Sequence, residues 1–210
     1  APLPTGGYLE QADGTAWMAI YCQNMLEIAN ELAMHDEAFQ DMAIKFTQHF
    51  LWIGSAMIHA GGDTGMWDED DGFFYDVLRL PDGQSQRLKV RSMVGLLPLC
   101  AATVFEGEVL KKYPAVAERM IDFLNARPEL TAFIHDPRKT GVAGRRLGSI
   151  LEETKLRRVL AKMLDEKEFL SPYGIRALSR YHAEALPWIY LGAAAAAAAL
   201  AAANALGVCI

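Results

Sequence analysis

Aromatic rings and carboxylates lie side by side in residues 65–92, and this combination could bind a sugar. The stretch "GMWDEDDGFFYDVLRLPDGQSQRLKVRS" carries four consecutive acids directly after Trp67, and an aromatic run then ends at Tyr75, next to Asp76. Flat rings stack on the faces of pyranose sugars, and carboxylates accept hydrogen bonds from sugar hydroxyl groups. The stretch therefore predicts part of the wall of a carbohydrate-binding cleft.

A structural interpretation of the same stretch stays open. Runs of charge usually face solvent, and the rings beside them can pack in the core. Lys89 and Arg91 alternate with Val90 in a strand-like segment, so they share a face. From that face they could pair with Asp76 across a hairpin. Asp76 and Arg91 would then brace the structure rather than touch a ligand.

The segment "YLEQADGTAW" is a second candidate for ligand binding. Glu10 and Asp13 come just before a predicted helix, at the end where the helix dipole favours anions and unpaired amides need partners. Trp17 lies one helical turn after Asp13, so both side chains could face one ligand. The alternative is that Asp13 is an ordinary N-cap and that Trp17 belongs to the core.

Other kinds of site find no support in the sequence. It contains no P-loop, GxGxxG, HExxH or GxSxG motif, so we expect no cofactor. The five histidines include no pair at i, i+4 spacing, and we expect no metal site. The net charge is −6 and the basic residues form no block, which argues against a nucleic-acid partner. The three cysteines are far apart and predict reduced thiols and a cytoplasmic protein.

Hydrophobic spacing predicts mainly helices. Residues 14–35 and 35–62 form two amphipathic helices joined by a short connection, hence an antiparallel helical hairpin. The turn sequence "PDG" joins residues 72–80 to residues 84–92 and predicts one small β-hairpin.

Further helical segments follow the β-hairpin: residues 93–105, 113–130 and 151–170, and a short helix that ends at His182. We therefore expect an all-α fold of helical hairpins, which could form a bundle, a solenoid or a closed toroid. Five or six helices suit roughly half of a twelve-helix (α/α)6 toroid, with the β-hairpin as an insertion. Residues 1–182 would make up this partial domain.

The C-terminal segment, residues 183–210, is nearly pure alanine after Leu191. Alanine favours a plain helix, and it is too weakly apolar to drive membrane insertion, so we expect no membrane span. A third possibility is that the tract is not natural sequence. The chain also opens on "APLPTGG" without Met or a signal pattern, and we expect it to be processed or a piece of a longer protein.

Three segments resemble the catalytic domain of bacterial glucosidase-like proteins of glycoside hydrolase family 63. They are "APLPTGGYLEQADGTAWMAIYCQNMLEIA", "MWDEDDGFFYDVLRLPDGQSQRLKVRSMVGLLPLCA" and "EFLSPYGIRALSRYH". The resemblance implies an (α/α)6 toroid and inverting hydrolysis of α-linked glucosides. Relatives among the processing α-glucosidases carry the motif E-x-H-x-D-x-x-x-W. Asp13 and Trp17 match its second half, while Glu10 stands one position too close to Asp13 and the His is absent.

The resemblance implies that this chain is part of a glycoside hydrolase. The chain itself would lack both catalytic carboxyls, because the acid and the base of the family lie outside the matched segments. Asp13, Trp17 and Glu10 would contact sugar, and Trp67 and Tyr75 would stack on it or line the cleft. Asp76 and Arg91 would brace this substrate-binding site. The chain alone is then expected to be inactive. The alternative function is a non-catalytic helical scaffold or protein-interaction domain. In both cases we expect exposed apolar faces that permit self-association.

Overall fold

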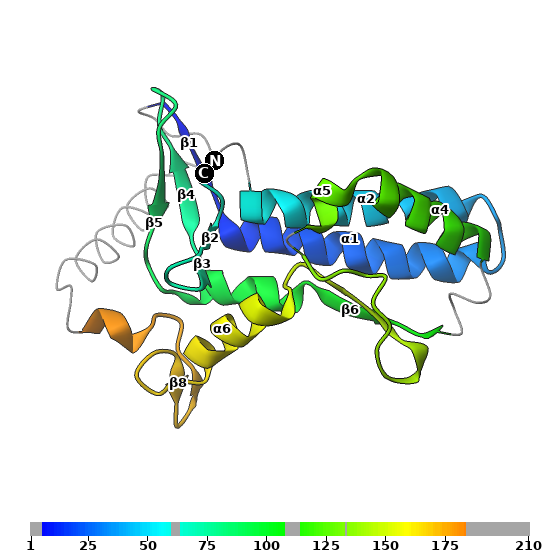
Figure 1. The fold of residues 1–210 in the computed structure, drawn as a ribbon. Coiled ribbons are helices and arrows are strands. Elements are labelled where there is room, and N and C mark those ends of the chain that lie inside the picture. Colours follow the sequence, from blue (N-terminus) through cyan, green and yellow to red (C-terminus); the bar gives the residue numbers. More distant parts are fainter. Residues whose placement is uncertain (1–5, 60–63, 108–113, 133, 184–210) are drawn as a thin grey trace, which may run out of the picture.

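Two long antiparallel helices and a three-stranded sheet organise the chain in the computed structural model, which describes residues 6–59, 64–107, 114–132 and 134–183 (Figure 1). Helix α1 spans Ala12–Ala33 and α2 spans Phe39–His59, and the two pack along their length. The predicted helical hairpin is thus confirmed. Its physical basis is the face of α1 that carries Ala12, Ala16 and Ala19, all fully buried, where small side chains permit close helix packing.

The predicted β-hairpin is also confirmed. Strand β4 (Asp76–Arg79) pairs antiparallel with β5 (Ser85–Leu88), and Asp76 lies opposite Leu88. Gly83 closes the turn in the left-handed region, with φ of +86°, and its N–H donates to the Leu80 carbonyl at 3.0 Å. Strand β1 (Tyr8–Glu10) adds to the other edge of β4 and leads directly into α1. The sheet therefore places the start of α1 beside Asp76.

The prediction of an all-α fold, half of an (α/α)6 toroid, is wrong, because the described residues form a mixed α/β structure with four antiparallel sheets. Besides the three-stranded sheet there are three two-stranded ones. They pair β2 (Trp67–Asp68) with β3 (Phe73–Phe74), β6 (Ala102–Phe105) with β7 (Arg146–Ser149), and β8 (Leu170–Ser171) with β9 (Gly174–Ile175).

Residues 93–105, predicted as a helix, form instead the 3-10 helix η1 (Met93–Cys100) followed by strand β6. Pro98 provides no N–H for a helical hydrogen bond. Gly95 lies so close to the core that a Cβ there would be 2.3 Å from Phe73 Cε1. Beyond Ala101 the backbone finds its hydrogen-bond partners in β7, 40 or more residues later in the chain. Residues 102–105 are therefore a strand because they pair with β7, and the spacing of nearby hydrophobic residues does not reveal this pairing.

The remaining helices are short. Helix α4 (Pro114–Ala126) begins at the predicted proline, and α4 and α5 (Pro128–Thr131) pack against α2. Helix α6 (Glu153–Met163) ends well before the predicted residue 170, and the 3-10 helices η2 (Val142–Gly144) and η3 (Arg180–Ala183) complete the described part. None of the described helices is long and apolar enough to span a membrane. The predicted alanine-rich helix lies, from residue 184 on, outside the described residues.

The core joins the hairpin to the C-terminal part of the chain. Phe73, Phe74 and Tyr75 are buried beneath η1 and α6, and Phe73 stacks on Phe169 with ring centroids 5.6 Å apart. Figure 1 shows α6 and β8 below the helical layer, on the side of the molecule where the β4–β5 hairpin stands. Two residues predicted to bind a ligand, Trp67 and Tyr75, are therefore part of the aromatic core.

Candidate functional site

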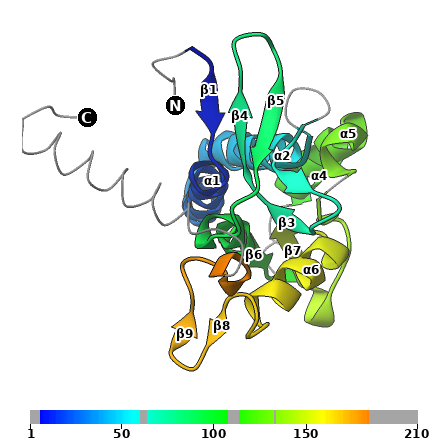
Figure 2. The same ribbon diagram turned by 90° about the vertical axis from the view of Figure 1, so that its left-hand side faces the viewer.

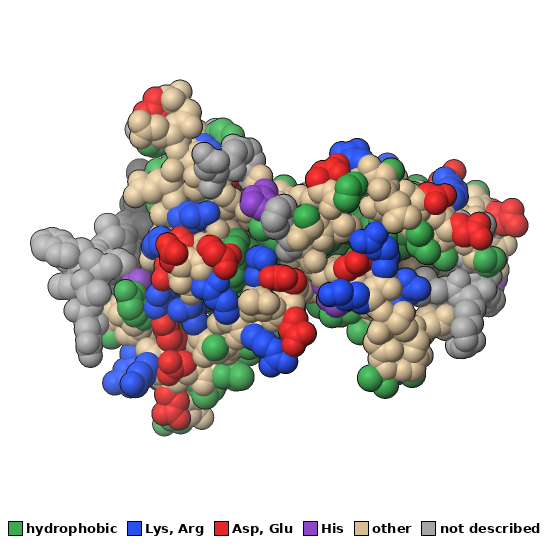
Figure 3. Space-filling model, in the orientation of Figure 1, with side chains coloured by type: hydrophobic (Ala, Val, Ile, Leu, Met, Phe, Trp, Pro, Cys, Tyr) green, Lys and Arg blue, Asp and Glu red, His purple; other side chains and the backbone are tan. Residues whose placement is uncertain are grey.

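The residues predicted to form a site lie in two neighbouring places. Glu10, Asp13, Trp17 and Asp76 are at the junction of β1, β4 and the start of α1. Trp67, Tyr75 and Arg91 belong to a network of charged groups between the hairpin and α6. Figure 3 shows acidic and basic side chains gathered together on the face that carries this network.

At the junction, Asp76 caps α1 from a distant part of the chain. Its Oδ1 accepts a hydrogen bond from the Ala12 N–H at 2.7 Å, while Gln11, the N-cap, makes no side-chain cap. Asp13 lies inside the first turn, where its Oδ1 accepts the Gly14 N–H at 2.6 Å, so the prediction of Asp13 as N-cap is wrong. Burial raises the pKa of Asp76, the Ala12 N–H opposes this rise, and the negative charge of Asp13 adds to it.

A pocket of about 380 Å³ opens beside this helix end. Polar groups of Glu10, Gln11 and Thr15 line it, and Leu9, Gly14, Ala56 and Met66 complete the wall. Glu10 is held by Arg79, whose Nη2 lies 2.9 Å from Glu10 Oε2. Trp17, one turn along α1 from Asp13, is 58% exposed. The junction therefore carries the exposed Trp17 ring and the Asp13 carboxylate in the first two turns of α1, and a pocket lined by Glu10 at the same helix end.

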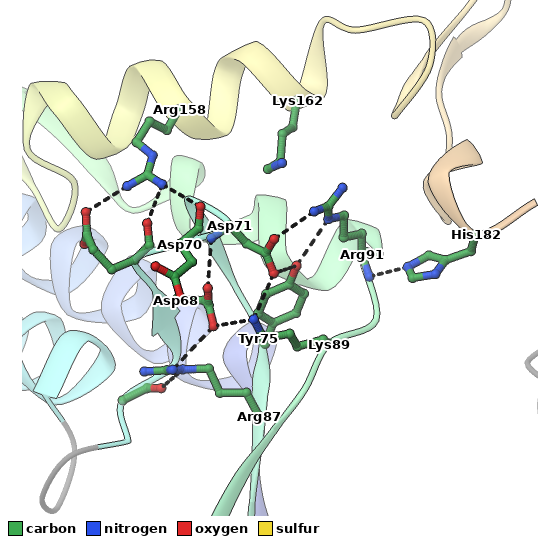
Figure 4. A network of polar contacts seen from close by, with 12 residues as sticks. Asp68, Asp70, Asp71, Tyr75, Arg87, Lys89, Arg91, Arg158, Lys162 and His182 are labelled. Atoms are coloured by element: carbon green, nitrogen blue, oxygen red, sulfur yellow. Dashed lines mark hydrogen bonds and ion pairs between the residues drawn. The ribbon is translucent and has the colours of Figure 1, made fainter. Parts of the chain in front are cut away.

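The charged network is centred on Asp68 and Asp71, which lie in the acidic run (Figure 4). Lys89 bridges the two acids, with its Nζ 2.9 Å from Asp68 Oδ2 and 3.2 Å from Asp71 Oδ2. Arg87 lies 3.4 Å from Asp68 Oδ2. Asp68 and Asp71 of the acidic run thus form ion pairs with cations of β5 and of the residues just after it.

Arg91 joins the network to the C-terminal part of the chain. Its Nη2 lies 2.9 Å from Asp71 Oδ1 and its Nη1 lies 2.6 Å from Glu168 Oε1. The guanidinium lies 3.9 Å above the centre of the Tyr181 ring, and the Arg91 N–H donates to His182 Nε2 at 2.8 Å. The predicted pairing of Lys89 or Arg91 with Asp76 does not occur, because the Asp76 carboxylate is turned to α1.

Burial, hydrogen bonds and neighbouring charges shift the pKa values of four groups in this network, Asp68, Asp71, Tyr75 and His182. Burial raises the pKa values of Asp68 and Asp71, but hydrogen bonds and the nearby cations outweigh it and lower both. Burial raises the pKa of Tyr75 to about 12, so its phenol stays neutral, donating to Asp71 Oδ2 and accepting from Arg91 Nε. Burial and Arg91 lower the pKa of His182, whose buried Nδ1 finds no hydrogen-bond partner among the described residues.

Trp67 and Tyr75 are buried, so neither ring presents a free face to a ligand in this structure. The Trp67 Nε1–H donates to Glu69 Oε2 at 2.5 Å, and the cations of Lys155 and Arg158 lie 5.7 and 5.6 Å from its ring centre. Beside it lies a pocket of about 400 Å³ whose walls include Asp68, Glu69, Asp70, Arg87 and Lys155. Trp67 is itself part of the wall of this pocket.

Sequence reasoning missed Asp71, Glu168 and His182 as members of the network. Glu168 and His182 come about 80 residues or more after their partners, and no local pattern connects them. The available signal was the group of cations Arg87, Lys89 and Arg91, which follows the acidic run in sequence. Within the described ranges, no group of three or more His, Cys, Asp or Glu side chains is placed to hold a metal ion.

No family model matches the chain. It is similar to "Uncharacterized protein YMR196W" of Saccharomyces cerevisiae (strain ATCC 204508 / S288c), with 43% identity over 194 residues. The match covers 86% of this chain and 18% of the yeast protein, so this chain spans less than a fifth of that relative's length.

Proposed function

We propose that this chain forms part of an inverting glycoside hydrolase that acts on α-linked glucosides, and that it contributes a sugar-contacting surface. The surface is the junction at the start of α1, with the exposed ring of Trp17, the carboxylates of Asp13 and Glu10, and the adjoining pocket. The observation that carries the proposal is the exposure of the Trp17 ring one helical turn from Asp13, at the same end of α1 as the pocket that Glu10, Gln11 and Thr15 line. A ring that is accessible next to carboxylates suits the apolar face and hydroxyl rim of a pyranose.

The proposal assigns the chemistry to residues outside this chain. Inverting hydrolysis needs one carboxylic acid to protonate the leaving oxygen and one carboxylate to activate water, about 6.5–9.5 Å apart. The acids of the described network are held in ion pairs and are poor candidates for either role. The yeast relative is several times longer, which supports a larger protein that supplies both carboxyls. A cytoplasmic location is part of the same proposal.

Sugar binding is tested by titrating maltose and nigerose against the protein and following saturation transfer to the sugar protons by NMR. Both sugars should bind, and Trp17→Ala should weaken binding about tenfold, the effect of losing one stacking ring. Tyr173→Ala is the control, because the Tyr173 ring is fully exposed at the β8–β9 turn and does not line the pocket at the start of α1, so its loss should leave binding unchanged.

Catalysis is tested on the natural gene product at its full length. It should release glucose from maltose or nigerose with inversion, which NMR detects as the β-anomer appearing first. The chain of residues 1–210 alone should release none. Equal binding by wild type and Trp17→Ala would contradict the sugar surface, and a full-length product without hydrolase activity would contradict the enzyme.

The burial of Trp67 and Tyr75 favours a second candidate, a non-catalytic scaffold or protein-interaction domain. In this case the ring-and-acid stretch serves only to hold the hairpin against α6. Absence of sugar binding at the junction, together with specific binding of another polypeptide, would favour the scaffold over the hydrolase.

A further inference from the structure

Helix α1 carries a regular apolar stripe on the side that faces away from the core. The stripe consists of Met18, Tyr21, Met25, Ile28 and Leu32, which follow one another at spacings of three and four residues. Met25 is half-buried, and the other four side chains are between 40% and 53% exposed, although the Tyr21 ring also meets the Phe46 ring of α2 edge-on, with centroids 6.4 Å apart. We call these five residues the outer seam. Their spacing is that of the contact positions of two helices that pack at a shallow angle.

The opposite face of α1 is already occupied. Ala16, Ala19, Cys22 and Leu26 are buried there, where α1 packs against α2 and η1. Figure 2 views α1 nearly end-on, with the other described helices lying to one side of it and below it. A helix that is apolar on both faces is typical of the interior of a larger protein rather than of its surface. The outer seam is therefore a surface that requires a partner.

The charge on α1 specifies the kind of partner. Its residues include Asp13, Glu27 and Glu31 and no Lys or Arg. Glu31 directly precedes Leu32 and flanks the seam. An amphipathic helix with Lys or Arg at the edge of its apolar stripe would fit both the spacing and the charge. A second copy of α1 would instead bring three further acids to an acidic helix.

The size of the seam also argues against a second copy. Five half-exposed side chains offer roughly 500 Å² to a partner. Stable interfaces between separate proteins bury about 800 Å² on each side. A helix of the same polypeptide avoids most of the entropy cost of association and can dock on a smaller surface. The yeast relative, of which this chain matches 18%, offers ample sequence for such a helix.

We propose that the outer seam of α1 is covered by an amphipathic helix of the same polypeptide, from outside residues 1–210, with Lys or Arg beside Glu31. This inference does not rest on sugar binding, because it is argued from the seam residues and the charge of α1, without Trp17 or the pocket at the start of α1.

Oxidative labelling of the natural gene product at its full length tests the proposal, with mass spectrometry as the readout. Met18 and Met93 are 53% and 47% exposed in this structure, and Tyr21 and Tyr181 are 52% and 55% exposed, so each pair is matched. The seam residue of each pair should be oxidised several-fold more slowly than its counterpart. Equal rates within both pairs would overturn the proposal, as would a gene product that contains only residues 1–210.

Photo-crosslinking then identifies the occupant. A benzoylphenylalanine introduced at Asn24, an exposed position beside Met25, should form an adduct with a Lys- or Arg-containing peptide of the same polypeptide outside residues 1–210. Adducts with a second copy, accompanied by Met18 protection that increases with protein concentration, would overturn the choice of occupant. Adducts with an unrelated protein would overturn it as well.

Discussion

At the scale of single residues, Arg91 joins its own segment to two others, residues 71–75 and the segment after α6. Its guanidinium contacts Asp71 from the acidic run, Tyr75 from the core and Glu168 from the segment after α6. These partners are 16 to 77 residues away in sequence. Because Arg91 and Glu168 are both mostly buried, water cannot replace either partner of the ion pair, and removing one would leave the other charge buried and unpaired at a cost in free energy.

Replacing Arg91 should therefore be strongly destabilising. Arg91→Ala leaves Glu168 buried without its main counter-charge and should cost about 3–5 kcal/mol of unfolding free energy, measured by urea denaturation. Arg157→Ala is the control, because Arg157 pairs with Glu153 on the exposed face of α6 and should cost about 0.5 kcal/mol or less. Similar losses in the two variants would show that the network contributes little.

The same network predicts how stability depends on pH. Asp68 and Asp71 have lower pKa values in the folded protein than in the unfolded chain, so their ionised forms stabilise the fold. This contribution is complete above the unfolded value of about 4 and is lost as the pH falls through the lowered folded values. Asp76 has a raised pKa and acts in the opposite direction, offsetting part of the loss.

Urea denaturation from pH 6 to pH 2 should therefore show stability that falls steeply with acid, and less steeply in Asp71→Asn. The variant removes one carboxylate whose proton uptake differs between the folded and unfolded states. If the free energy of unfolding falls equally steeply with acid in the wild type and in Asp71→Asn, the charge of Asp71 does not contribute to stability.

At the scale of elements, η1 depends on a close approach between backbone and ring. A Cβ at Gly95 would lie 2.3 Å from both Phe73 Cε1 and the Phe74 carbonyl oxygen. Because the ring is buried and the carbonyl is backbone, neither neighbour can move away easily. Gly95 thus sets the distance between η1 and β3.

Gly95→Ala should lower the free energy of unfolding by about 1–3 kcal/mol or more through overpacking. Gly14→Ala provides a contrast of opposite sign. A Cβ at Gly14, in the first turns of α1, meets only Gln11 Cβ at 3.8 Å, and the helix should gain about 0.5–1 kcal/mol. Thermal and urea unfolding of the two variants check the difference, and a neutral Gly95→Ala would mean that η1 can shift.

At the scale of the whole molecule, aromatic packing connects the hairpin region to the segment that follows α6. Phe73 and Phe169 are fully buried, and their rings stack with an interplanar angle of 22°. Above this stack, Arg91 and Glu168 form their ion pair, and Ser179 Oγ donates to the other oxygen of Glu168. Apolar and polar contacts thus hold the same two parts of the chain together.

Phe169→Ala should leave a cavity at this junction and cost about 3–5 kcal/mol. Hydrogen exchange should increase in both segments that the ring joins, residues 66–76 and residues 168–182. Tyr173→Ala, which removes a fully exposed ring at the β8–β9 turn, should change stability by about 0.5 kcal/mol or less. Faster exchange confined to residues 168–182 would show that the two segments are independent.

The sequence by itself determined the elements that depend on neighbours in the chain. The α1–α2 hairpin follows from helical spacing, and the β4–β5 hairpin follows from the turn residues 81–83. The ring-and-acid stretch was also recognisable as unusual from composition alone. These features were predictable because their hydrogen bonds and side-chain contacts join residues that are close in sequence.

Only the tertiary structure decided the elements and contacts that join residues far apart. Strand β6 exists because β7 pairs with it, although local pattern alone favoured a helix there. Asp76 caps α1 rather than pairing with Arg91, and Arg91 turns to Glu168, 77 residues away. Burial of Trp67 and Tyr75 likewise depends on α6 and η1 closing over them. Charges and rings of the same type have many possible partners, and only the packing of the whole chain selects among them.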